Sequence, residues 1–260
     1  MSGYILCQTK KAETPYYIEN ISTNIYSLEE LCYYFYHNLY LVDHSILNEG
    51  LLTWIQDELN LPKLAAKLRA KLGKFSSIED FLYPVFKEIN YLTYEELKGL
   101  NSRIQKLDKE SPLVREKEKG DALAENGMYV HAIRAYQDLL KQEDLEEVRE
   151  GFRENVYHNL GCAYSYLFQM EKALECFLKA YEEHHSRSAL KTYLLAFHSI
   201  RTPIEYESRA ADLGADREVL DEIRNDLAHF ARQPRVHVHN RNIDNMLERF
   251  TREYHRSTGS

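Results

Sequence analysis

One pattern of small and aromatic residues occurs twice in the middle of the chain, and no other feature constrains the fold as strongly. The clearer copy covers residues 157–181, where the small residues Gly161 and Ala173 stand among large ones. The pattern consists of Tyr157, Leu160, Gly161, Tyr164, Ala173, Phe177 and Ala180. Small residues let two antiparallel helices cross closely, and large residues fill the space beside the crossing. The segment therefore predicts a helical hairpin.

A second copy lies earlier in the chain, at residues 117–140. Its corresponding residues are Gly120, Gly127, Tyr129, Ala132, Tyr136 and Leu139. Gly127 is expected in the turn between the two helices. A third hairpin is expected at residues 188–213, which lack the small-residue signature, so this segment is interpreted as a degenerate repeat or a cap.

The two copies resemble the tetratricopeptide repeat family, and the resemblance covers about a third of the chain. Gly161 follows Gly120 by 41 residues, seven more than the family period of about 34 residues, and the acidic stretch 143–154 holds the excess. The resemblance implies that successive hairpins stack into an α-solenoid with a concave groove. The family binds an extended peptide or a partner helix in that groove. The chain is also similar to bacterial proteins that contain such repeats.

The resemblance places the groove on the first helix of each hairpin. The expected peptide-binding residues, from the groove and from the clamp considered next, are Lys117, Asn155, His158, Asn159, Tyr166, Arg187 and Lys191. Asn159 is the best single candidate, because an amide both donates to and accepts from an extended backbone. The sequence thus predicts a non-catalytic adaptor or scaffold that binds a segment of another protein.

A subset of the family holds the C-terminal carboxylate of a peptide with a clamp of Lys, Asn and Arg side chains. Lys117 and Asn159 match two clamp positions, and Arg187 with Lys191 would add cations if the third hairpin begins two residues earlier. Asp121 replaces an Asn of the clamp, and its charge would repel a carboxylate. Ordinary solvated charges on helix surfaces are the alternative interpretation.

The first 110 residues predict a small β hairpin followed by a helical bundle. Two short runs rich in aromatic and β-branched residues, 4–7 and 15–18, are the expected strands. Capping signals and apolar residues at three- and four-residue spacing predict the helices. They are expected at residues 27–40, 48–59, 61–72, 76–89 and 93–106.

Polar segments with proline, at 109–112 and 201–203, mark the expected domain boundaries. The sequence predicts an all-α protein with a minor β hairpin and three parts. These are an N-terminal domain at 1–110, tetratricopeptide-like hairpins at 111–200 and a helical cap at 201–260, with a last helix at 242–255.

Charge and cysteine content limit the classes of partner. A net charge of −8 argues against a general nucleic-acid binder, which needs a basic face. The four cysteines, at positions 7, 32, 162 and 176, form no CxxC pair, which is typical of free thiols in a reducing cytoplasm. No apolar run reaches the length that spans a bilayer. We therefore expect a cytoplasmic protein with no membrane partner.

A ribonuclease is the alternative function. Arg224, Asn225 and His229 match the R-N-x-x-x-H element of HEPN-type RNA nucleases. The resemblance implies that Arg224 and His229 of two protomers meet at the scissile phosphate without a metal. The alternative interpretation, without a catalytic role, is a helix with an exposed Arg and a packed His. A peptide-sensing regulator is a further alternative, although the N-terminal region shows no helix-turn-helix pattern.

The sequence indicates no metal site and no cofactor. His237 and His239 have no third ligand at metal-binding spacing, and His184 with His185 ends a repeat helix. Glycine-rich phosphate loops and the common hydrolase and metalloprotease motifs do not occur in it. The oligomeric state stays open.

Overall fold

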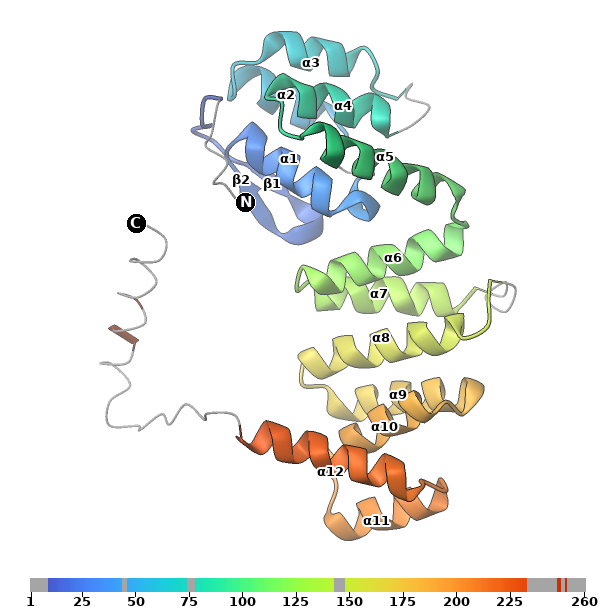
Figure 1. Ribbon diagram of the computed structural model, residues 1–260. Coiled ribbons are helices and arrows are strands. Elements are labelled where there is room, and N and C mark those ends of the chain that lie inside the picture. The colour runs from blue at the N-terminus through green and yellow to red at the C-terminus, as the bar shows by residue number, and fades with distance from the viewer. Residues whose placement is uncertain are drawn as a thin grey trace. The chain divides into compact units, whose positions relative to one another are not determined.

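The computed structural model describes residues 9–43, 46–73, 78–142, 148–232, 247–248 and 251. The described residues are mostly helical, with twelve α-helices and one two-stranded antiparallel sheet near the N-terminus (Figure 1). This content confirms the predicted fold class. The chain divides into two compact units, Met1–Glu207 and Ser208–Ser260. The predicted boundaries after residues 110 and 200 stay predictions.

The small sheet pairs β1 (Tyr16–Ile18) with β2 (Thr23–Ile25), with Tyr16 opposite Ile25. A 3-10 turn, Glu19–Ile21, and Ser22 in the left-handed region connect the strands. The sequence predicts β1 but not β2, because a three-residue strand after a tight turn leaves a weak pattern. The short connection between β1 and β2 costs little loop-closure entropy, which favours their pairing. The other expected strand, residues 4–7, lies outside the described residues.

Five helices follow the sheet: α1 (Leu28–His37), α2 (Glu49–Asp57), α3 (Pro62–Arg69), α4 (Glu79–Glu88) and α5 (Tyr94–Lys109). Their core contains the fully buried Phe35, Leu51 and Phe81. The Ser27 hydroxyl caps α1 by accepting from the Glu30 N–H, as the sequence predicts. Helix α1 ends three residues earlier than expected, and a 3-10 turn (Leu39–Leu41) follows it. The expected start of α4 at residues 76–77 lies outside the described residues.

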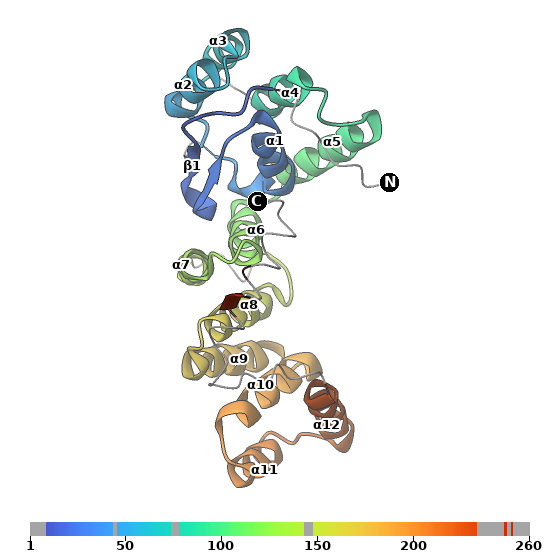
Figure 2. The same cartoon turned by 90° about the vertical axis from the view of Figure 1, so that its left-hand side faces the viewer.

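The next five helices are α6 (Pro112–Glu125), α7 (Tyr129–Leu140), α8 (Phe152–Tyr166), α9 (Met170–His184) and α10 (Arg187–Ile200). Each packs against the next one, from α6 to α10 (Figures 1 and 2). Helices α6 with α7 and α8 with α9 form antiparallel hairpins at the two places where the sequence predicts them. Helices α11 (Pro203–Asp212) and α12 (Arg217–Arg232) follow.

Glycines at the two helix crossings account for the repeated sequence pattern. A Cβ atom on Gly161 would lie 2.5 Å from Cε1 of Phe177, and one on Gly120 would lie 2.5 Å from Cε1 of Tyr136. Each aromatic ring therefore packs directly on the backbone of the facing helix. Gly127 has a φ of 75° in the turn between α6 and α7, a conformation that glycine adopts without strain.

Polar contacts join the α6–α7 hairpin to the N-terminal helices within the first unit. The Asn126 amide donates to Asn38 Oδ1 at 2.7 Å, and Lys119 pairs with Asp43 at 3.2 Å. Helix α6 also packs on the 3-10 turn that follows α1. Among the described residues, no helix combines the length and the apolar character needed to cross a lipid bilayer.

Candidate functional site

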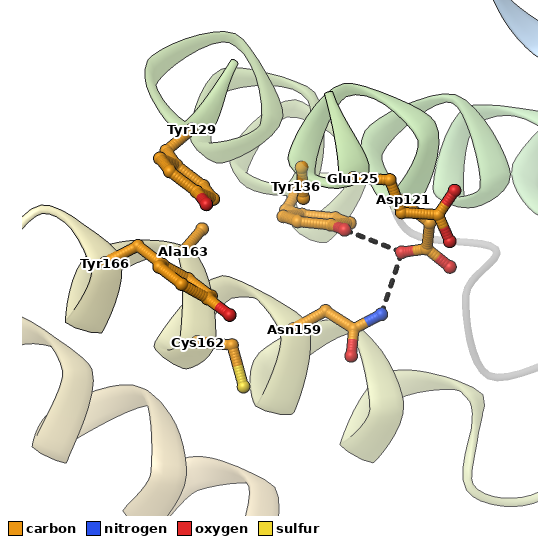
Figure 3. A pocket seen from close by; sticks show the side chains of 9 residues that line it. Asp121, Glu125, Tyr129, Tyr136, Asn159, Cys162, Ala163 and Tyr166 are labelled. Atoms are coloured by element: carbon orange, nitrogen blue, oxygen red, sulfur yellow. Dashed lines mark hydrogen bonds between the residues drawn. The ribbon is translucent and has the colours of Figure 1, made fainter. Parts of the chain in front are cut away.

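A pocket of about 390 Å³ lies between α6, α7 and α8 (Figure 3). It is lined by Asp121, Ala124, Glu125, Tyr129, Tyr136, Asn159, Cys162, Ala163 and Tyr166. Helices α6 and α8 are the first helices of successive hairpins, on which the resemblance described above leads us to expect a binding groove. We refer to it below as the α6–α8 pocket.

The Asp121 carboxylate joins all three helices of the pocket. Its Oδ1 accepts from the Tyr136 hydroxyl at 2.6 Å and from the Asn159 amide at 2.7 Å. The buried Lys117 ammonium pairs with Oδ2. Burial and the bond to Asp121 raise the pKa of Tyr136 further above neutral pH, and its hydroxyl donates to the carboxylate. These bonds hold the Asn159 side chain in one orientation.

Two tyrosines form an aromatic wall at one side of the pocket. Tyr129 begins α7 and Tyr166 ends α8, and their rings stack with centroids 4.6 Å apart at an interplanar angle of 5°. Tyr166 is 65% exposed, so part of its surface is open to a ligand. Stacked tyrosines bring apolar area and polar tips to one place, which suits protein binding.

Cys162 and His158 lie one turn apart on α8, with Sγ 3.6 Å from Nε2. Burial raises the pKa of the Cys162 thiol and lowers the pKa of the His158 imidazole. Both shifts favour the neutral forms, whereas a cysteine nucleophile needs the thiolate. The pair therefore gives the pocket a neutral thiol on its wall.

The structure brings together three of the predicted peptide-binding residues. Asn159 and Tyr166 line the α6–α8 pocket, and Lys117 reaches it through Asp121. Asn155 instead bonds the Gly151 carbonyl at 2.7 Å, at the start of α8. His158, Arg187 and Lys191 are not among the lining residues, and the last two belong to α10.

The ribonuclease candidates lie on α12, in the second unit. Arg224 and His229 are both exposed, and Arg224 pairs with Asp221 at 2.7 Å. Five residues correspond to about 140° around a helix, so the two side chains leave α12 in different directions. His237 and His239 lie outside the described residues. Within the described ranges, no group of three His, Cys, Asp or Glu side chains is arranged to hold a metal ion.

Sequence reasoning missed Glu125, Tyr129 and Tyr136 as pocket residues. The spacing holds a signal for Glu125, because it follows Asp121 by four residues and must share its helix face. Tyr129 and Tyr136 belong to the repeat pattern, which favours a packing role. Comparison of the chain with protein-family models, curated proteins and solved structures finds no significant match.

Proposed function

We propose that the chain is a non-catalytic adaptor of the tetratricopeptide type, which binds a segment of a partner protein at the α6–α8 pocket. One observation carries the proposal. A stacked aromatic pair, in which the Tyr166 ring is exposed, and a fixed amide face one hollow between the first helices of two successive hairpins. Peptide-binding grooves combine these features, because apolar area supplies affinity and polar groups fix register.

The hydrogen bonds of Asn159 define how it would meet a ligand. Its Nδ2 donates to Asp121, which leaves the amide oxygen as an acceptor. That oxygen suits a backbone N–H of an extended segment, while the exposed Tyr166 ring suits an apolar side chain. Recognition of this kind depends on the partner backbone and on a few anchoring side chains.

Photo-crosslinking tests the proposal at the pocket itself. We expect Tyr166→p-benzoylphenylalanine to form adducts with a partner in lysate of the source cells. The same replacement at Tyr94, which begins α5 and is 84% exposed, serves as the control and should form none of these adducts. Equal adducts at both positions, or none at position 166, would contradict the proposal.

A pair of asparagine variants locates the contact more sharply. Asn159→Ala should weaken the adduct formed at position 166, because it removes the fixed acceptor. Asn155→Ala, one turn earlier on α8, should leave the adduct unchanged, because that side chain bonds its own helix start. Equal losses in both variants would place binding elsewhere on α8.

A further inference from the structure

The α6–α8 pocket is acidic. Asp121 and Glu125 are its charged lining residues, and no basic side chain of a described residue lines it. A second hollow of about 550 Å³ has the opposite character. It lies between α7, α8 and α9, and its charged lining residues are Lys141, Lys172, Lys179 and Glu175. An anionic group is therefore better matched to the second hollow than to the α6–α8 pocket.

The two carboxylates of the α6–α8 pocket differ in their availability to a ligand. Asp121 is engaged by Lys117, Tyr136 and Asn159, and Lys117 offsets its charge. Glu125 is exposed, and it has no ion pair or hydrogen bond with any described residue. Glu125 therefore carries the negative charge that a ligand can neutralise.

The aromatic wall faces this charge across the hollow. Figure 3 shows Tyr129 and Tyr166 at one side of the pocket, with Asp121 and Glu125 at the other. A guanidinium group fits such a site, because it stacks on aromatic rings and donates paired hydrogen bonds to a carboxylate. An ammonium group has no planar face to stack.

We propose that the α6–α8 pocket binds an arginine side chain of the partner segment, which crosses the hollow from the aromatic wall at Tyr166 to the Glu125 carboxylate. The inference rests on the proposed function and names the chemistry of the partner. It differs from the carboxylate clamp expected from the sequence, because the guest is a cation and the pocket supplies the carboxylate.

The cysteines of the two hollows report the local charge without any partner. Cys162 lines the acidic pocket and Cys176 lines the lysine-rich one. The probes are methanethiosulfonates of similar size that carry a trimethylammonium or a sulfonate group. Peptide mass mapping of the native protein gives the modification rate of each thiol with each probe. The cation-to-anion ratio is the rate with the trimethylammonium probe divided by the rate with the sulfonate probe. We expect a ratio above one at Cys162 and below one at Cys176.

Glutamate variants assign the preference to one carboxylate. Glu125→Gln should lower the ratio at Cys162 by about threefold, the effect of one charge at short range in a solvated site. Glu116→Gln removes the same charge from the opposite face of α6 and should leave the ratio unchanged. A ratio of one or less at Cys162 in the native protein would overturn the proposal.

Selection of random decapeptides displayed on phage separates this inference from the proposed function. We expect enriched peptides to share an arginine, and Glu125→Gln to weaken their binding by about tenfold. Enriched peptides that need the pocket but contain no arginine would overturn the inference and leave the adaptor intact. If no peptide is enriched on the native protein, both proposals fail.

Discussion

At the scale of single residues, two glycines allow the hairpins to close. Gly120 and Gly161 each lie under an aromatic ring of the facing helix, at distances that no Cβ atom tolerates. Phe177 is buried and also contacts His158, so its ring has little room to move away. Glycine is normally unfavourable within a helix, and here the close packing offsets that cost.

Alanine substitutions should separate these two effects. We expect Gly161→Ala to lower the free energy of unfolding, because three ring atoms of Phe177 would lie within 3.0 Å of the added Cβ. Overpacking this close costs up to about 3 kcal/mol, which exceeds the gain in helix propensity of about 1 kcal/mol. Gly99→Ala in α5 is the matched control, since nothing lies within 4 Å of its Cβ position. It should raise the free energy of unfolding by about 0.5–1 kcal/mol. Urea unfolding measures both, and a stabilised Gly161→Ala protein would contradict the close crossing.

At the scale of elements, helix α5 begins with a reciprocal cap. The Glu96 N–H donates to the Thr93 hydroxyl, and the Glu96 carboxylate accepts from the Thr93 N–H at 2.8 Å. These hydrogen bonds lower the pKa of Glu96. The carboxylate therefore stabilises the fold at pH values above the ordinary glutamate pKa, and this contribution is lost as the pH falls through the lowered pKa.

The pH dependence of unfolding tests this cap. At neutral pH we expect Glu96→Gln to unfold at a lower urea concentration than the native protein. The difference should shrink as the pH falls below about 4.3. Glu95→Gln is the control for charge alone. It removes a carboxylate of the same helical turn, and this carboxylate forms no hydrogen bond or ion pair with a described residue. A difference between Glu96→Gln and the native protein that stays constant with pH would exclude a role for the ionised cap.

Local signals explain which elements the sequence predicts correctly. Ser27, Asn48 and Thr93 cap α1, α2 and α5, whose starts the sequence predicts at these positions, because a cap and the helix after it lie within one turn of each other. The glycine and aromatic pattern likewise reports a contact that recurs in each hairpin. The contacts of the α6–α8 pocket could not be predicted in this way. The bond from Asn159 to Asp121 and the stacking of Tyr129 on Tyr166 join residues nearly forty positions apart, and no local pattern specifies such pairs.

At the scale of the whole molecule, residues 1–207 form one compact unit. The unit contains the sole tryptophan, Trp54, which is buried among the N-terminal helices and donates to the Thr14 carbonyl at 2.8 Å. Contacts such as Asn126 with Asn38 connect those helices to the hairpins. We therefore expect the two regions to unfold together.

Two optical signals test this cooperativity. Trp54 fluorescence reports the N-terminal helices, whereas far-UV ellipticity reports all helices. The urea midpoint of the fluorescence change should coincide with that of the main loss of ellipticity, because coincident transitions are the mark of a two-state unit. Asn38→Ala should shift both midpoints together. Loss of most ellipticity while Trp54 remains native would show that the hairpins unfold separately.

The two carboxylates of the α6–α8 pocket differ in how freely they can be substituted during evolution. Asp121 is tied to Lys117, Tyr136 and Asn159, so an inherited change there disturbs hairpin packing before any ligand is involved. Glu125 has no comparable ties, so a lineage can exchange it while keeping the scaffold. New ligand preferences can then arise through position 125, against a background in which position 121 is held fixed by folding.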